Sequence, residues 1–116
     1  MRSKGCLLAV LALSLPLAAQ DPVKVDPKHY KVEFENSDVR VLRITYGAGE
    51  KSVMHEHPNA VAVFLTDEQT RFTLPDGKTQ DVRNKAGQTE WTPAGKHLPE
   101  NTGSKRMELV LVELKK

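Results

Sequence analysis

After residue 20, the chain alternates between short apolar runs and clusters of turn-forming residues. No segment there keeps the spacing of an amphipathic helix, in which apolar positions recur every three or four residues. Short runs rich in Val, Ile, Thr and Phe, bounded by Gly, Pro, Asn and Asp, are typical of strands. The pattern predicts strands at residues 32–34, 39–46, 52–55, 61–66, 71–74, 79–82, 89–92, 96–98 and 107–114.

The turns and the apolar runs together predict an all-β sandwich or barrel. Pro75-Asp76-Gly77 is the clearest hairpin signal, because glycine supplies the positive φ that such a turn requires. Residues 61–65 and 109–112 are apolar on both faces, so both faces must be covered. A second copy of the chain would cover the outer face of so small a barrel, which predicts a homodimer. Alternatively, the N-terminal strands cover it.

The first twenty residues have the pattern of a secretory signal peptide. Arg2 and Lys4 precede an apolar run at residues 6–17, and the small residues Ala18 and Ala19 follow it. We expect cleavage after Ala19 or the next residue, because a membrane-spanning helix would need about 20 apolar residues. The protein is therefore expected to be exported, periplasmic or secreted, with no membrane contact beyond the cleaved signal. The only cysteine lies in this segment, so the mature chain has no disulfide.

Composition and charge allow one globular domain and argue against nucleic acid as a partner. The chain has 116 residues, 39% of them hydrophobic and 28% charged. Without the two basic residues of the signal segment, 15 of the 17 basic residues remain against 15 acidic ones, so the mature charge is zero. No basic face or run is visible, whereas nucleic-acid-binding domains usually carry one. We interpret residues 21–31 as a loose leader and residues 32–114 as the domain.

Histidines carry the strongest chemical signal. His55 and His57 are separated only by Glu56. In an extended strand such residues point to the same side, about 7 Å apart, so both imidazoles can turn towards one ion. Alone this pair is a weak signal, since an exposed histidine pair is the simpler interpretation. His97, which follows the tight turn at residues 93–95, is the natural third ligand from a distant strand.

Two blocks around these histidines resemble the two motifs of the cupin superfamily, in particular its small single-domain members of the cupin 2 conserved-barrel type. Residues 49–57 (GEKSVMHEH) match the first motif, which runs Gly, five residues, His, one residue, His. The second motif is matched in order by Gly87, Pro93, Gly95, His97 and Asn101. The resemblance covers residues 32–114 and implies a jelly-roll β-barrel (RmlC-like) with a divalent metal inside. It also implies that His55, His57 and His97 are the metal ligands.

Two departures from the family pattern affect this site. The first motif normally continues, after three or four further residues, with a glutamate ligand, and here those positions hold Val61 and Ala62. A neutral three-histidine set remains, which favours Zn²⁺, Cu²⁺, Ni²⁺ or Fe²⁺ and leaves positions open for water or substrate. The second motif is one residue short, with only Lys96 between its second glycine and His97. A one-residue shift turns a strand side chain to the opposite face, so His97 points inward only if the turn shortens equally.

The remaining polar and aromatic candidates are expected to have structural roles. We expect His29 to be a surface histidine rather than a fourth ligand. Glu100 should be a solvated loop charge rather than a carboxylate behind His97. Asn101 should hold its turn through side-chain–backbone hydrogen bonds. Four aromatic residues can line a pocket, but core packing is their default role: Tyr46, Phe64, Phe72 and Trp91.

Three functional hypotheses follow from the sequence. The first is a metalloenzyme that acts on a small organic molecule in an oxygenase-like or isomerase-like reaction. The second is a cupin that binds a metal or a small molecule without turnover. The third is a purely structural barrel, which the histidine pair and the distant histidine make the least favoured. A fold of this type serves enzymes, storage proteins and regulators alike, so it does not choose between them.

Overall fold

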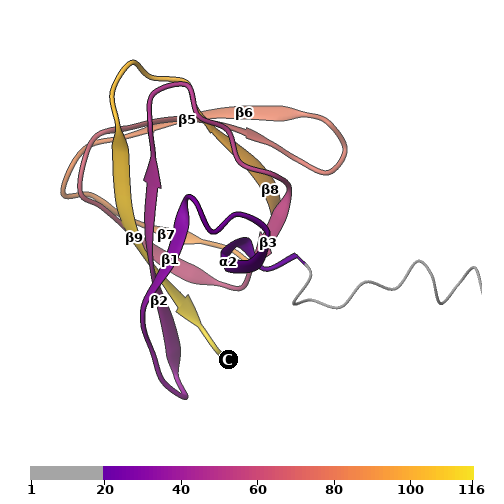
Figure 1. The fold of residues 1–116 in the computed structure, drawn as a ribbon, viewed down its shortest axis with the longest axis vertical. Coiled ribbons are helices and arrows are strands. Elements are labelled where there is room, and N and C mark those ends of the chain that lie inside the picture. The colour runs from indigo at the N-terminus through magenta and orange to yellow at the C-terminus, as the bar shows by residue number, and fades with distance from the viewer. Residues whose placement is uncertain (1–19) are drawn as a thin grey trace, which may run out of the picture.

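A computed structural model describes residues 20–116 as a two-sheet β structure with one short helix (Figure 1). The predicted signal peptide, residues 1–20, lies outside the described residues except for Gln20. Across the described part of the chain, no helix is long and apolar enough to cross a membrane. The elements in chain order are α2 (Pro22–Val25), β1 (Tyr30–Glu35), β2 (Val39–Tyr46), β3 (His55–His57), β4 (Ala60–Phe64), β5 (Glu68–Thr73), β6 (Thr79–Asn84), β7 (Thr89–Thr92), β8 (Gly95–Asn101) and β9 (Met107–Leu114).

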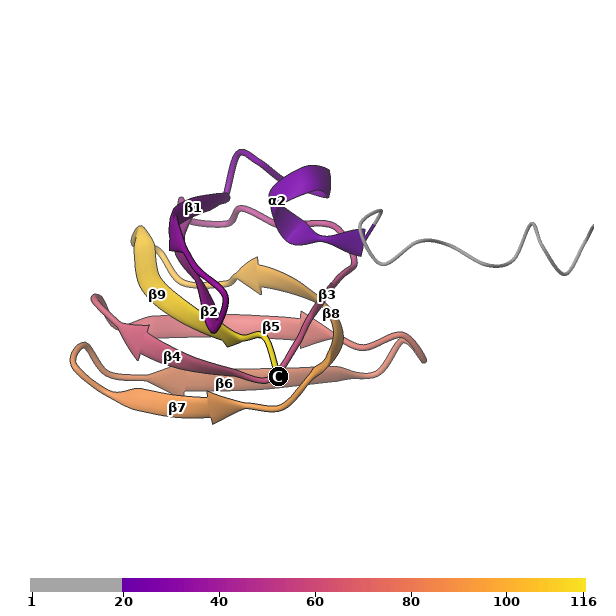
Figure 2. The same ribbon diagram turned by 90° about the horizontal axis from the view of Figure 1, so that it is seen from below.

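The strands form two antiparallel sheets (Figure 2). One sheet has five strands in the order β1-β2-β9-β4-β7, and the other has four in the order β3-β8-β5-β6. Neighbours such as β2 and β9, or β3 and β8, are far apart in sequence, so the chain crosses repeatedly between the sheets as in a jelly roll. The prediction of an all-β two-sheet barrel is confirmed.

Alternation of side chains places the hydrophobic core between the sheets. Burial along β9 alternates over its whole length, with Met107, Leu109, Leu111 and Glu113 inside. Removing a Leu-sized side chain from water stabilises a fold by about 1.5–3 kcal/mol, so this inner face is the main source of stability. The core comprises Tyr30, Leu42, Ile44, Tyr46, Ala60, Ala62, Phe64, Met107, Leu109 and Leu111.

Two predicted turn features are confirmed. Gly77 has a φ of 87° in the β5–β6 hairpin, where its amide donates to the carbonyl of Leu74 at 2.9 Å. Asn101 is buried, and its side-chain amide donates to the backbone carbonyls of Gly47 and Lys105 at 3.1 and 2.8 Å. Its side-chain oxygen accepts from the amide of Gly103 at 2.9 Å. Asn101 therefore ties together two connections that are distant in sequence.

The predicted strand at residues 52–55 was placed too early, since β3 begins at His55. The reason is a slip in register against β8: Lys51 bridges Glu100, whereas His55 pairs with His97. One more residue lies between these two contacts on the β3 side than on the β8 side, which is the geometry of a β-bulge. The bulged segment is irregular, and Val53 within it is exposed. Regular pairing therefore starts at the first histidine.

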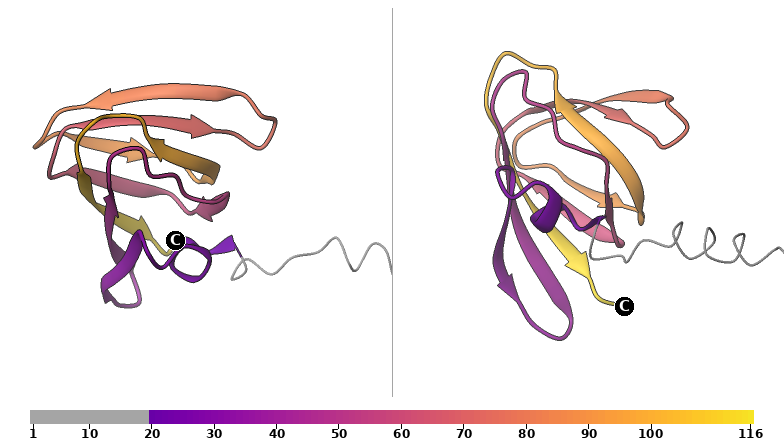
Figure 3. Two further views of the ribbon diagram at one scale, coloured as in Figure 1. Left: turned by 45° about the horizontal axis from the view of Figure 1, so that its top comes forward. Right: turned by 45° about the vertical axis from the view of Figure 1, so that its right-hand side comes forward.

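The prediction of a loose leader at residues 21–31 was wrong. Residues 22–25 form α2, capped by the Asp21 side chain, which accepts from the amide of Val23 at 3.0 Å. The helix packs against β1 and β3 (Figure 3), and Pro22, Asp26 and Tyr30 are buried. Charge and proline suggested disorder, but Pro22 occupies a first-turn position that suits it, and Asp21 and Asp26 pair with Arg40 and His29.

The outer face of the five-stranded sheet combines an apolar patch with the ion pair of Arg43 and Glu108. It carries a row of half-buried valines from β2, β4 and β9: Val41, Val61, Val63, Val110 and Val112. Strand β1 extends this sheet beside β2 and does not lie across that face. The alternative in which an N-terminal strand covers the valines is therefore not what the described residues form.

Candidate metal centre

Three histidines from two adjacent strands converge inside the barrel. His55 and His57 lie on the same face of β3, and β8 places His97 directly opposite His55 in the antiparallel pair. The three ring centroids are 4.8–5.2 Å apart. One ring nitrogen from each residue lies within 4.8 Å of the others, a spacing at which they can hold one metal ion. His97 points inward despite the short second motif, because it lies on the same face of β8 as the buried Pro99 and Asn101.

The bulged segment between Lys51 and His55 orients the ring of His55. Its Nδ1 lies 2.8 Å from the carbonyl oxygen of Val53, so Nδ1 carries the proton and donates it. The other nitrogen, Nε2, is then a free lone pair. Among residues 20–116, this Nε2 is the one buried side-chain nitrogen or oxygen without a hydrogen-bond partner. A buried polar atom without a partner costs about 1–3 kcal/mol, so its presence indicates a ligand-binding role.

His57 is oriented by a buried carboxylate. Its Nδ1 donates to Oε2 of Glu113 at 2.6 Å, and both side chains are buried. The other carboxylate oxygen, Oε1, accepts from Nε of Arg40 at 2.8 Å. With Nδ1 engaged, Nε2 of His57 is the nitrogen left for the site. A carboxylate behind a histidine in this way fixes the ring and raises its basicity as a ligand.

The environment keeps two of the histidines neutral. Burial, followed by the nearby His57, lowers the pKa of His55 to about 4. Burial, followed by the neighbouring His57 and His55, lowers the pKa of His97 to about 3. His97 also stacks on Phe72, with ring centroids 4.7 Å apart. Neutral imidazole is the form that binds a metal, so these side chains are ready to act as ligands at neutral pH.

The residues present fit a divalent transition metal. The donor set is three imidazoles, and within residues 20–116 no carboxylate joins the group. The positions where the resemblance would place a glutamate hold Val61, which faces outward, and Ala62, which is buried in the core. Imidazole donors suit Zn²⁺, Cu²⁺, Ni²⁺ and Fe²⁺.

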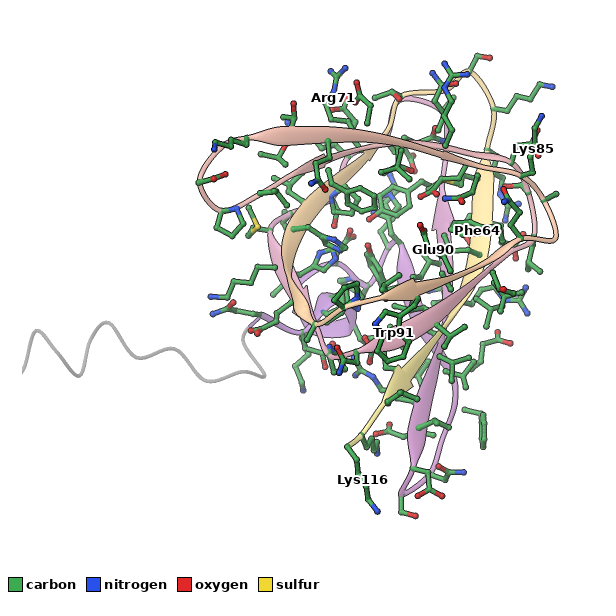
Figure 4. All side chains as sticks on the ribbon, turned by 180° about the vertical axis from the view of Figure 1, so that it is seen from behind. Phe64, Arg71, Lys85, Glu90, Trp91 and Lys116 are labelled. Atoms are coloured by element: carbon green, nitrogen blue, oxygen red, sulfur yellow. The ribbon has the colours of Figure 1, made fainter. Side chains whose placement is uncertain are left out.

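A cavity of about 390 Å³ adjoins His57 and His97. Its walls are mainly apolar and include Ile44, Phe64, Phe72, Val82, Leu109 and Leu111. Its polar wall includes Glu68, whose pKa is raised by burial and which accepts from Asn84 at 2.6 Å. Figure 4 shows Glu90 pointing between the sheets, consistent with its place in the cavity wall. The space suits a small and largely apolar molecule.

Three expectations about individual residues were wrong. His29 is buried, not at the surface, and its ring stacks on that of Tyr46. Its Nδ1 lies 2.7 Å from Oδ2 of Asp26, and its Nε2 lies 3.0 Å from Oε1 of Glu50. Glu100 lies within β8, opposite Arg71, and is not in a loop. Trp91 does not pack in the core, since it is 54% exposed and lies opposite Val61 on the outer face of the sheet.

Sequence reasoning missed the residues that support the histidines. Glu113 lies at the end of an apolar run in which Met107, Leu109 and Leu111 occupy the inner face. Every second residue of a strand faces the same side, so Glu113 could have been placed on that inner face, as a buried charge that needs a partner. The same alternation along β2 places Arg40 on the inner face with Leu42. The ion pair between Arg40 and Glu113 could not be predicted from the sequence, because it depends on the pairing of β2 with β9.

Comparison with known proteins finds similarity in structure only. No protein-family model matches the chain, and no curated protein matches it. A cupin domain from Bordetella pertussis Tohama I superposes with a TM-score of 0.69 at 22% identity, covering 75% of this chain and 92% of its own. An RmlC-like cupin family protein from Methanocaldococcus jannaschii, with a double-stranded β-helix fold, gives a TM-score of 0.58 at 22% identity, covering 77% and 83%.

A further structure extends the likeness over more of the chain. An uncharacterized conserved protein with a double-stranded β-helix domain from Klebsiella pneumoniae gives a TM-score of 0.59 at 17% identity, covering 88% of this chain and 89% of its own. At such low identities the likeness establishes the fold and nothing finer. The predicted fold class, a single-domain jelly-roll barrel of the cupin type, is confirmed.

Proposed function

We propose that this chain is an exported protein of cupin-type fold that binds one divalent transition metal through His55, His57 and His97. The observation that carries the proposal is the buried Nε2 of His55, which has no partner and lies within reach of the other two imidazoles. The metal would be Zn²⁺, Cu²⁺, Ni²⁺ or Fe²⁺, and it would supply a Lewis acid at one end of the cavity. The chain's own part is to present three neutral nitrogens in fixed orientations.

The adjoining cavity supports binding of a small organic molecule. Its apolar walls would exclude water and take up a compact apolar body. Phe72 forms a wall beside His97, so a molecule in the cavity would contact both. The proposed role is therefore either an oxygenase-like or isomerase-like reaction on that molecule, or its binding without turnover.

One observation favours binding, or a reaction that needs no general acid. Burial raises the pKa of the Glu68 carboxyl, and a raised pKa favours the protonated form that a general acid needs. However, Glu68 precedes Phe72 by four positions on β5, which is roughly 13 Å along a strand. Glu68 would therefore not reach a compact molecule held against His97. This weighs against an isomerase-like reaction that depends on Glu68, and leaves Glu90 as the other carboxyl of the cavity wall.

Metal content tests the proposal. Protein purified without chelators, or incubated with each of the four metals, should hold close to one ion per chain by elemental analysis. The triple variant His55→Ala/His57→Ala/His97→Ala should take up none and keep the β-sheet circular dichroism signal. Glu56→Gln is the matched control, because its side chain lies on the opposite face of the same strand and should leave uptake unchanged. Less than about a tenth of an ion per chain, with no gain on adding metal, would refute the proposal.

Export and a homodimer are part of the same proposal. Residues 1–20 support export, and the half-buried valines on the outer sheet face support a second copy as the partner that covers them. Fractionation of expressing cells should find the protein outside the cytoplasm, shortened by about twenty residues. Light scattering should give twice the chain mass, and a monomer at micromolar concentration would contradict the dimer.

A further inference from the structure

The N-terminal segment, residues 21–30, contacts the metal centre from outside the barrel. It comprises helix α2, the buried Asp26 and the first residue of β1. Figures 1 and 3 both show α2 beside β3, the strand that carries two of the three histidines. Three separate contacts connect this segment to His55 and His57.

The first contact is a chain of charged hydrogen bonds that ends at His57. Both Nη nitrogens of Arg40 donate to the two carboxylate oxygens of Asp21, each at 2.8 Å. Nε of the same guanidinium donates to Oε1 of Glu113 at 2.8 Å, and Oε2 of Glu113 accepts from His57 at 2.6 Å. All four side chains are at least four-fifths buried.

The way in which Arg40 shares its N–H groups between two carboxylates explains how Asp21 affects His57. Glu113 has two oxygens, one for Arg40 and one for His57. Asp21 occupies the two remaining Nη groups of Arg40 and so keeps them away from the second oxygen of Glu113. Without that carboxylate, the guanidinium is free to take both oxygens in the bidentate geometry that it prefers. His57 would then lose the partner that holds its ring.

The second and third contacts reach His55. Asp26 accepts from the hydroxyl of Ser52 at 2.6 Å, and this hydroxyl lies 3.4 Å from Nδ1 of His55. The rings of Tyr30 and His55 pack in a T-shaped arrangement with centroids 4.9 Å apart, and the Tyr30 centroid lies 5.8 Å from that of His57. The segment thus fixes one ligand through a hydrogen-bonded serine and confines both rings by packing.

We infer that residues 21–30 are a positioning element of the metal centre, in which Asp21 acts on His57 through Arg40 and through Glu113 of β9. The inference rests on the proposed metal binding. Docking of the segment orients Nε2 of His55 and His57 before an ion arrives, so docking and metal affinity are coupled. Such coupling is reciprocal: whatever docking adds to metal affinity, metal binding adds to docking.

The test combines metal affinity with a measurement on the segment itself. The variants are Asp21→Asn, which can still cap α2 but loses the charge, and Glu113→Gln, which can still accept from His57. Lys24→Ala, on the exposed side of α2, is the matched control. We expect Zn²⁺ affinity to fall about tenfold or more in both variants and to change less than twofold in the control. The visible spectrum of the Co²⁺-loaded protein should change in the variants and not in the control.

Hydrogen exchange supplies a readout that does not depend on the variants. In the unaltered protein, Zn²⁺ should slow amide exchange at residues 21–30 more than in the distant β5–β6 hairpin. Circular dichroism of the metal-free variants checks that they fold. If the unaltered protein binds Zn²⁺ while both variants keep its affinity and residues 21–30 show no protection, the positioning role is wrong and the proposed function stands. If the unaltered protein binds no metal, both fail.

Discussion

Lowering the pH should destabilise the metal-free protein through His55 and His97. An imidazole in the unfolded chain has a pKa of about 6.5. The folded state holds the pKa of His55 at about 4 and that of His97 at about 3, in both cases chiefly by burial. Between these values the unfolded chain binds protons that the folded chain does not. Neither histidine therefore lowers the free energy of unfolding above pH 6.5. Below pH 6.5 that free energy falls, until the pH reaches about 4 for His55 and about 3 for His97.

The size of the effect follows from the distance to the unfolded pKa. At pH 5, each unfolded histidine lies about 1.5 pH units below its pKa, while each folded one is still neutral. One pH unit corresponds to about 1.4 kcal/mol, so each histidine lowers the free energy of unfolding by about 2 kcal/mol between pH 7 and pH 5. The two together remove about 4 kcal/mol, a large share of the 5–15 kcal/mol typical of a domain.

Urea unfolding of the metal-free protein at pH 7, 6 and 5 measures this loss. His97→Gln is the informative variant, because it keeps a side chain of similar size at the half-buried cavity wall but does not titrate. Its loss of stability between pH 7 and pH 5 should be about 2 kcal/mol smaller than that of the unaltered protein. Equal losses in the two proteins would refute the assignment of a neutral imidazole with a lowered pKa at residue 97.

Two further predictions concern buried hydrogen bonds. Asn101→Ala should lower the free energy of unfolding by roughly 3 kcal/mol in urea titrations, because several buried backbone groups lose their partner, and a loss under about 1 kcal/mol would contradict that role. The hydroxyls of Tyr30 and Tyr46 lie 2.6 Å apart, so either Tyr→Phe change should cost about 1–3 kcal/mol, and the double change should cost less than the two single losses combined. Strictly additive losses would show that the hydroxyls are not coupled.

The sequence alone determined most of the strands, the β5–β6 turn and the identity of the clustered histidines. Alternation by two along β2 and β9, and glycine at the β5–β6 turn, are local features that each stretch of chain carries by itself. The spacing of His55 and His57 likewise needs only an extended backbone to place both on one face. The resemblance of two short blocks to known motifs then pointed to His97 and to the jelly-roll fold.

Only the tertiary structure decided how these strands are paired and what stands behind the histidines. His97 lies opposite His55 in the register of β3 on β8, and a local pattern cannot reveal how two strands that are distant in sequence pair. The link from Asp21 through Arg40 to Glu113 joins residues 19 and then 73 positions apart in the sequence. Charges near an end of the chain resemble a solvated leader until folding brings their partners to them, because the cost of burying a charge is offset only by a partner that tertiary contacts supply.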